Sequence, residues 1–492
     1  MTKAKIHYHD IGDYLSREEK LAIVKKNRGI ANVQWQALTP NEHGDWINLR
    51  NDDFSSFIPI GDKETKSSNT FFISKYSRGL TTARDHFCWN FSESLLEINI
   101  KKIVSFYNEQ CKDYHNAKKD NVQIDVDTFI NYDSTKVTWN RGFKQDLERE
   151  IYFKYSRNNI YQGLYRPFCK QHIYFAKELN DMTYQMPKIF PTKNHKNLVI
   201  CISGIGVSKD FSALITDVIP DLQVQANGQC FPLYYYEEKH LNYCEGNLVR
   251  EKNLFETESE EDYIRRDAVS DFILKRCKAQ YGKNVTKEDI FYYVYGFLHS
   301  PKYRETFASD LKKMLPRLPL VDDVRDFWAF SKAGRALAEL NLNYEHAGKH
   351  PGVIELYNPL SITDILKQTN KEKMEYLNRR VEKMRFGKKG KDVDKSTIIY
   401  NSQISLEKIP LKAYDYIVNG KSAIEWVMER YQVTTHKESG IVNDPNLYAE
   451  ENAQPRYILD LLHSVITVSV ETMKIVESLP QWEIKDSKEE NV

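Results

Sequence analysis

The sequence has no long apolar run, no paired cysteines and almost no net charge. No window approaches the ~18 consecutive apolar residues that a membrane-spanning helix needs, and residues 1–8 lack the apolar segment of a secretory signal. The seven cysteines are scattered without a C-x-x-C pair, so neither a disulfide framework nor a zinc ribbon is indicated. These absences predict a cytoplasmic protein that contacts no membrane.

The near-balance of charges says little about the partner. Seventy Lys and Arg residues face 69 Asp and Glu residues, for a formal net charge of +1. A polyanion would therefore have to bind at a local basic patch. The length of 492 residues exceeds what one hydrophobic core usually supports and predicts two or three domains.

Complete catalytic motifs are also missing. Gly420-Lys421-Ser422 resembles the end of a phosphate-binding loop, but Asp415 stands where that loop requires glycine. The turn at residues 204–206 follows an apolar strand, yet Lys209 replaces the third glycine of a dinucleotide fingerprint. No metalloprotease, serine hydrolase or nuclease pattern is present. We therefore predict no catalytic, cofactor-binding or metal-binding residues in this chain.

One stretch, residues 164–236, combines buried-strand signals with basic and amide side chains. Residues 197–203 form an apolar strand that ends in a tight turn, and amides cluster at 223–229. Arg and Lys pair with guanine, and Asn and Gln pair with adenine. We expect DNA contacts from the strand-end loops, although a non-functional loop would also explain the amides; the candidates are Arg166, Lys170, Gln171, Ser208, Lys209, Gln223, Gln225, Asn227 and Gln229.

Two further segments carry side chains that contact phosphates. Lys75, Arg78 and Arg84 lie among glycine and hydroxyl residues, where an ordinary polar loop with Arg84 and Asp85 solvated or locally paired is the alternative. Residues 379–391 are the densest basic run, punctuated by glycine, and predict either an anion-binding loop or a solvated hairpin tip. The candidates here are Arg385, Lys388 and Lys389.

Capping signals and apolar periodicity predict the main elements. Ser16 precedes acidic first-turn residues, and Thr286 with Asp289 gives a Thr-x-x-acid pattern, so both mark helix starts. Residues 6–12 alternate as a strand does, and the charged segment after residue 118 suggests a domain boundary near 120–135. Further helices are predicted over residues 92–110, 322–342, 421–431 and 454–479.

Six segments together resemble the C-terminal portion of type ISP restriction-modification enzymes. They are residues 77–91, 165–168, 202–221, 229–234, 293–304 and 315–319. In these large single-chain proteins a nuclease, an ATP-driven translocase, an adenine-N6 methyltransferase and a target-recognition domain follow one another. The resemblance extends over nearly the whole chain, from Ile6 to the last helix.

The resemblance implies an α+β fold, with a truncated α/β methyltransferase tail followed by a mixed β-rich target-recognition domain whose C-terminal part is helical. Residues 1–130 would be the methyltransferase remnant, 131–350 the target-recognition domain, and 351–492 the C-terminal part of the specificity domain with hairpins and a long packing helix. The methyl-donor and N-P-P-Y motifs of the family are absent here. We expect them, the helicase motifs and the nuclease to lie upstream of Met1.

The implied function is recognition of a specific double-stranded DNA sequence for a bacterial or archaeal restriction-modification system. An upstream methyltransferase, translocase and nuclease polypeptide would be the partner, and S-adenosylmethionine, ATP and Mg²⁺ would serve the complete enzyme. An inactive orphan fragment of such an enzyme is one alternative. A stand-alone DNA methyltransferase is another, which the missing motifs disfavour.

Overall fold

The centre of the fold is a pair of four-stranded sheets. The computed structural model describes residues 4–12, 15–47, 49–120, 123–239, 262–357 and 379–483. One sheet has the order β10-β6-β7-β5, with β5 (Trp89–Asn90), β6 (Ile160–Arg166), β7 (Cys169–Tyr174) and β10 (Ile219–Pro220). The other has the order β4-β11-β8-β9, with β4 (Ser77–Arg78), β8 (Val199–Ile202), β9 (Ala213–Thr216) and β11 (Gln229–Pro232). The predicted strand at 197–203 is therefore confirmed as β8.

The remaining strands form a third four-stranded sheet and several hairpins and ribbons. The third sheet has the order β15-β18-β17-β16, with β15 (Ile354–Tyr357), β16 (Arg385–Lys389), β17 (Asp392–Ile399) and β18 (Ile404–Glu407). Two-stranded pairs are formed by β1 (Ile6–Tyr8) with β2 (Gln36–Leu38), β3 (Ile58–Pro59) with β14 (Arg317–Leu318), β12 (Tyr234–Glu238) with β13 (Tyr263–Asp267), β19 (Ile417–Val418) with β20 (Lys421–Ser422), and β21 (Thr434–Thr435) with β22 (Val442–Asn443).

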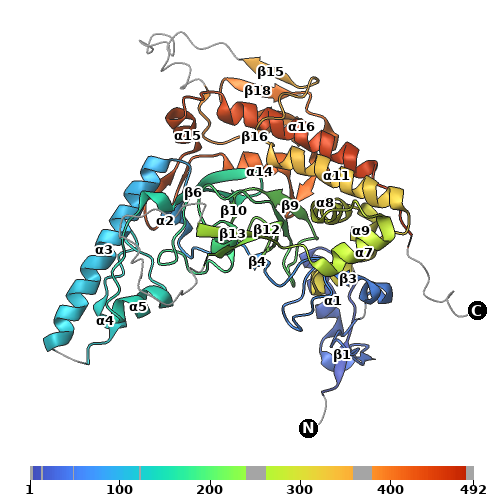
Figure 1. Ribbon diagram of the computed structural model, residues 1–492, viewed down its shortest axis with the longest axis horizontal. Helices are drawn as coiled ribbons and strands as arrows, with labels where there is room; N and C mark the ends of the chain where they lie inside the picture. The colour runs from blue at the N-terminus through green and yellow to red at the C-terminus, as the bar shows by residue number, and fades with distance from the viewer. Residues whose placement is uncertain are drawn as a thin grey trace, which may run out of the picture.

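Helices surround these sheets (Figure 1). They are α1 (Arg17–Asn27), α2 (Asp85–Cys88), α3 (Glu93–Asp120), α4 (Val126–Phe129), α5 (Arg141–Glu148), α6 (Met186–Ile189), α7 (Asp271–Tyr281), α8 (Lys287–Phe297), α9 (Pro301–Thr306), α10 (Ala308–Lys313), α11 (Val324–Leu342), α14 (Ala423–Arg430), α15 (Pro445–Glu451) and α16 (Tyr457–Glu477). The mixed α and β composition is as expected, and the strands are distributed among many small sheets. No helix among the described residues combines the length and apolar character that a membrane crossing needs.

The predicted helix starts at Ser16 and Thr286 are confirmed. Each hydroxyl accepts a hydrogen bond from the backbone N–H three residues on. The carboxylate of that residue, Glu19 or Asp289, in turn accepts from the backbone N–H of the cap residue, so both are complete capping boxes. Helix α3 is longer than the predicted 92–110. Its later turns continue the apolar spacing, because Cys111 and Tyr114 are buried in the same core as Tyr107.

The sheet that contains β8 and β11 is buried on both faces, between two hydrophobic cores. Along β8, Cys201 belongs to one core, whereas Ile200 and Ile202 belong to the other. Along β11, Cys230 belongs to the same core as Cys201, and Phe231 belongs to the same core as Ile200 and Ile202. Successive side chains of a strand point to opposite faces, so the continuous apolar sequence of β8 is explained by burial on both sides.

Strands from both sides of the expected boundary near residue 130 share sheets. Trp89 of β5 pairs with Ile173 of β7, and Arg78 of β4 pairs with Gln229 of β11. The close approach of β4 to the loop after β10 requires glycine, because a Cβ at Gly79 would lie 2.6 Å from the carbonyl oxygen of Asp221. The strands β4 and β5, which precede residue 130, are therefore structural parts of the central sheets.

Candidate nucleic-acid interface

The turn after β8 and the amide-rich loop at 222–228 lie against each other. The backbone N–H of Gly204 donates to the carbonyl of Ala226 at 2.8 Å, and a side chain at Gly204 would clash with Asn227. Asn227 itself has a φ of 48°, a left-handed conformation that asparagine tolerates. We call residues 204–210 and 222–228 the paired loops; their exposed candidates are Ser208, Lys209, Gln223 and Asn227.

Asn419, from the turn between β19 and β20, holds the paired loops in place. Its side-chain amide donates to the carbonyl of Gln223 at 3.0 Å, and its backbone N–H donates to the hydroxyl of Ser212 at 2.9 Å. The ammonium of Lys209 donates to the Asn419 backbone carbonyl at 3.0 Å and to its side-chain oxygen at 3.1 Å. The same Ser212 hydroxyl donates to Gln225 at 2.6 Å, and Gln225 is fully buried. The C-terminal part of the chain thus fixes the conformation of both loops.

Arg166 lies beneath the paired loops in a buried charge cluster. One guanidinium nitrogen donates to Asp221 at 2.7 Å, and the other donates to Asp85 at 3.4 Å. Asp221 also accepts from the backbone N–H of Gln223 at 2.8 Å. Burial raises the pKa of Asp221 to about 7, against the opposing effect of Arg166. Arg166 therefore supports the amide loop from inside, and its guanidinium is already occupied.

Three other candidate residues are also engaged within the protein. Lys170 forms an ion pair with Glu345 at 2.8 Å, and the side-chain oxygen of buried Gln171 accepts from Asn443 at 3.2 Å. Arg84 is 1% exposed and donates to the carbonyl of Leu179 at 2.6 Å. These contacts favour structural roles, because a side chain that is buried and bonded within the protein is not accessible to a base or a phosphate. One guanidinium nitrogen of Arg84 has no hydrogen-bond partner, but it is buried with the rest of the side chain.

Arg78 and Gln229, paired across β4 and β11, line a cleft next to the paired loops. The cleft has a volume of about 640 Å³ and also contains Ile205 of the turn. Lys63 and Arg317 line it too, although the sequence reading did not single them out. Both are isolated basic residues beside turn-forming residues, Gly61-Asp62 and Pro316, and the sequence gives no further sign that they share a cleft. Lys75 lies elsewhere, with its ammonium 5.7 Å from the centre of the Tyr235 ring.

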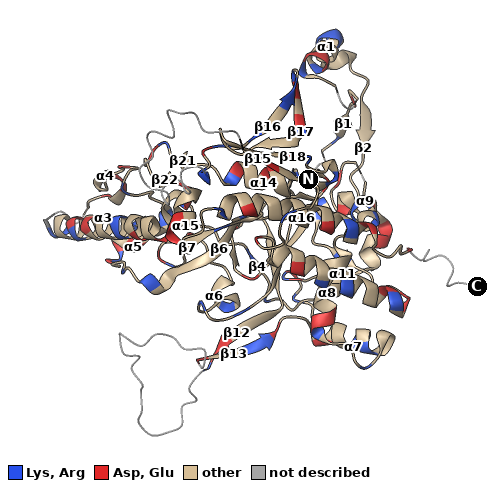
Figure 2. Cartoon of the chain, turned by 90° about the horizontal axis from the view of Figure 1, so that it is seen from above, with Lys and Arg blue, Asp and Glu red and all other residues tan. Residues whose placement is uncertain are grey.

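Residues 385–391 of the basic run form β16 and the turn into β17, so this part of the run is a hairpin tip; anion binding there stays a prediction. Gly390, with a φ of 63°, makes the turn, and Lys388, Lys389 and Lys391 are exposed around it. Lys389 lies 3.5 Å from Asp394 on the returning strand. Figure 2 shows these basic and acidic residues along the two strands.

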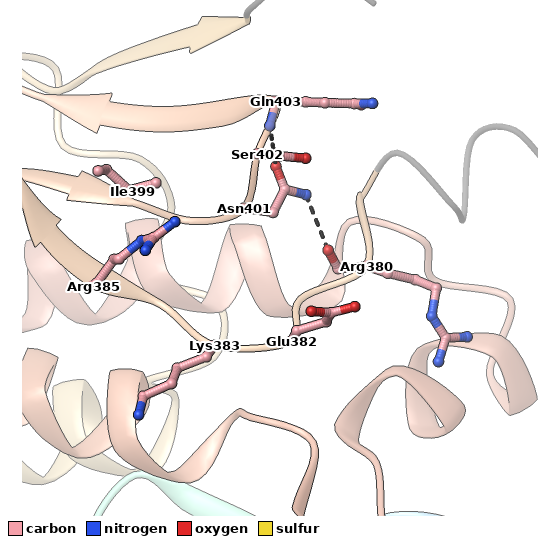
Figure 3. Close-up of a pocket in the computed structure, with 8 residues that line it drawn as sticks. All are labelled: Arg380, Glu382, Lys383, Arg385, Ile399, Asn401, Ser402 and Gln403. Carbon is pink, nitrogen blue, oxygen red and sulfur yellow. Dashed lines mark hydrogen bonds between the residues drawn. The ribbon is translucent and has the colours of Figure 1, made fainter. Parts of the chain in front are cut away.

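A hollow of about 800 Å³ lies at the base of this hairpin (Figure 3). Lys383 and exposed Arg385 line it together with Gln403. Asn401 is oriented by its own hydrogen bonds: its amide donates to the Arg380 carbonyl at 3.0 Å, and its oxygen accepts from the Gln403 backbone at 2.9 Å. The lining also contains the carboxylate of Glu382 and Arg380, which pairs with Asp444 and Glu450. The cations Lys383 and Arg385 and the amide of Gln403 are the groups suited to phosphates and base edges.

The described residues show no centre for metal chemistry. Within the described ranges, no three metal-ligating side chains gather at one point. The six cysteines that lie in these ranges are all buried as free thiols, and burial raises the pKa of Cys88 and of Cys169 to about 12. The chemistry that the arrangement offers is recognition through exposed amides and cations.

Comparison with known proteins gives one family and several similar structures. The family described as the type ISP C-terminal specificity domain matches residues 71–461. A nuclease-deletion mutant of the type ISP restriction-modification enzyme LlaGI, in complex with a DNA substrate mimic, is 34% identical with a TM-score of 0.79, over 98% of this chain and 40% of that one. The ATP-dependent type ISP enzyme LlaBIII bound to DNA is 35% identical, with a TM-score of 0.80; the match covers 98% of this chain and 28% of that one.

A third similar structure is a DrdV–DNA complex, 27% identical with a TM-score of 0.78 over 97% of this chain and 43% of that one. No curated protein is a significant match. The chain therefore spans less than half the length of each of these three structures.

Proposed function

The chain belongs to the family of the type ISP C-terminal specificity domain, and we propose that it recognises a specific double-stranded DNA sequence for a restriction-modification system. The observation that carries the proposal is the family match over residues 71–461, which includes the paired loops and the basic hairpin. The three similar structures are all described as complexes with DNA or a DNA mimic, which supports the same function.

The exposed amides of the paired loops are the part of this surface suited to base reading. Gln223 and Asn227 project from a loop whose backbone is held by Asn419, and Ser208 projects from the adjoining turn. Amide and hydroxyl groups pair with base edges in the major groove. Lys388, Lys389 and Arg385 of the hairpin are the part suited to phosphates, which set position but carry no sequence information.

We further propose that a methyltransferase, translocase and nuclease polypeptide completes the enzyme. The chain spans 40%, 28% and 43% of the three similar structures. The catalytic domains of such an enzyme would therefore lie outside this chain. S-adenosylmethionine, ATP and Mg²⁺ would act there, in the cytoplasm. Of the residues before 130, those that precede the family match at residue 71 would be the end of the methyltransferase domain, whereas β4 and β5 belong with 131–350 and 351–492 to the target-recognition part.

Selection from a random duplex pool in moderate salt tests the function. We expect the purified chain to enrich one short sequence, and we expect a Gln223→Ala, Asn227→Ala variant to enrich a more degenerate one. Lys112→Ala, an exposed charge change on α3, is the control and should enrich the wild-type sequence. Recovery of no preferred sequence by the wild type, with or without an upstream polypeptide, would contradict the proposal.

A further inference from the structure

Three cations that form no ion pair among the described residues line the cleft beside the paired loops. Lys63 follows β3, Arg78 belongs to β4, and Arg317 belongs to β14. None of the three forms an ion pair with any residue in the described part of the chain. Two neighbouring segments, at residues 63 and 78, and a distant one, at residue 317, therefore bring positive charge to one hollow of about 640 Å³.

The two arginines have donors that the protein leaves unused. The Nε of Arg78 and the Nε of Arg317 are both buried without a hydrogen-bond partner. Arg317 uses one Nη to donate to the Ser55 carbonyl at 2.8 Å, and the Arg78 guanidinium lies 5.8 Å from the centre of the Tyr184 ring. A buried donor without an acceptor is costly unless a ligand supplies the acceptor.

The acidic side chains of the cleft, Asp62 and Glu64, form no ion pair with the three cations, although the charge of Asp62 acts on Arg317. Asp62 accepts hydrogen bonds from the backbone N–H groups of Glu64 and Thr65, both at 2.9 Å, and so closes its own turn. Lys63 instead donates to the carbonyl of Tyr76 at 2.6 Å, a neutral acceptor. Lys313, a fourth cation in the lining, is already paired with Asp45 at 3.0 Å. Against the two carboxylates of the lining, Lys63, Arg78 and Arg317 leave an excess of positive charge.

We propose that this cleft binds one backbone phosphate of the DNA strand that passes the paired loops. The inference rests on the proposed function and adds Lys63 and Arg317 to the DNA-binding surface. A phosphodiester offers oxygens to two guanidinium groups at once. This suits Arg78 and Arg317, each of which has an Nε donor without a partner. Ile205 and Gln229 in the lining connect the cleft to the paired loops, so a phosphate held here would fix the register in which Gln223 and Asn227 meet the bases.

Salt dependence of binding to the selected duplex tests this assignment. Arg78→Ala and Arg317→Ala should each weaken binding by about ten- to hundredfold and lower the slope of log K against log salt by about 0.9, without changing the preferred sequence. Arg78→Lys keeps the charge, should fold as the wild type does, and should show an intermediate loss. Lys112→Ala is the charge-matched control, because Lys112 belongs to α3, which lies at the opposite side of Figure 1 from β3.

A duplex with single neutral methylphosphonate linkages identifies the phosphate itself. One position should weaken wild-type binding and have no further effect on the Arg78→Ala, Arg317→Ala variant. If the variants match Lys112→Ala in affinity and slope while the wild type still selects a sequence, the cleft assignment is wrong and the proposed function stands. If inorganic phosphate stabilises the wild type through Arg78 but the DNA slope is unchanged, the cleft holds a free oxyanion and the DNA assignment is equally overturned.

Discussion

The side-chain amide of Asn419 donates a hydrogen bond to the backbone carbonyl of Gln223 at 3.0 Å, across 196 residues of sequence. The two residues belong to different regions of the chain, a C-terminal hairpin and the amide loop of the central sheets. Asn419 also has a left-handed φ of 49°, which asparagine adopts at little cost. A single turn outside the paired loops therefore fixes the conformation of the amide loop.

Replacement of Asn419 should make the selected DNA sequence more degenerate, with a smaller effect on binding affinity. Asn419→Ala removes the amide donor, and we expect a more degenerate selected sequence and a loss of about 1–3 kcal/mol in the free energy of unfolding. Asn419→Gly is the matched variant, because glycine accepts the positive φ and lacks only the amide. Duplex selection and urea unfolding measure the two effects. An unchanged selected sequence in both variants would show that the hydrogen bond from Asn419 to Gln223 does not affect recognition.

Arg84 provides a test of structural against DNA-contacting roles. Its guanidinium donates to the Leu179 carbonyl and lies 3.6 Å from the centre of the Phe143 ring. Arg84→Met should therefore lower the free energy of unfolding by about 1–3 kcal/mol and leave the salt slope of DNA binding unchanged. The opposite result, a reduced slope with unchanged stability, would assign Arg84 to a phosphate.

The basic hairpin should contribute affinity without selectivity. Lys388→Ala with Lys389→Ala removes two exposed charges near the turn, and we expect the salt slope to fall by up to about 1.8 for all duplexes alike. The expected fall is smaller if Asp394 already neutralises Lys389. Filter binding to the selected duplex and to a scrambled duplex measures both. A loss confined to the selected duplex would instead indicate base contacts from the hairpin.

Stacked histidines predict a dependence of stability on pH. The rings of His86 and His436 are 3.8 Å apart and nearly parallel, at 3°. Burial, with a further effect of His436, lowers the pKa of His86 to about 4. The unfolded chain therefore binds a proton between about pH 6.5 and 4 that the folded chain does not, so acidification through this range should destabilise the protein by about 1–3 kcal/mol.

Comparison of His86→Phe with the wild type isolates this effect. The variant should lose the acid-dependent part of the change in unfolding free energy measured at pH 4, 5, 6 and 7. The comparison is needed because Asp221, whose pKa is raised, changes stability in the opposite direction: its contribution is fully present at low pH and is lost as pH rises toward about 7. Equal pH profiles for the two proteins would contradict the prediction.

Local sequence signals predicted the elements well. Ser16 and Thr286 marked helix starts because their bonds join residues three apart, and the apolar run at 197–203 marked a strand buried on both sides. The resemblance to type ISP enzymes, drawn from six segments, is confirmed by the family match. These features depend on neighbours in the sequence.

The state of the candidate site residues depended on distant partners and was not predictable. Lys170 is paired with Glu345, 175 residues away, and Gln171 contacts Asn443, 272 residues away. Residue type alone does not distinguish such a lysine from an exposed one. For the same reason Arg317 escaped notice, since only the pairing of β14 with β3 brings it into the cleft.

Burial of the β4-β11-β8-β9 sheet between two cores limits how its specificity could be re-engineered. Ile200 and Cys201 are adjacent yet serve different cores, so a chimera joined within this sheet would combine mismatched side chains in both. A junction near residue 130 would likewise divide the pairing of β5 with β7. New target sequences should be reached by exchanging residues 204–210 and 222–228 together with the Asn419 turn, as one unit assembled from three separate segments.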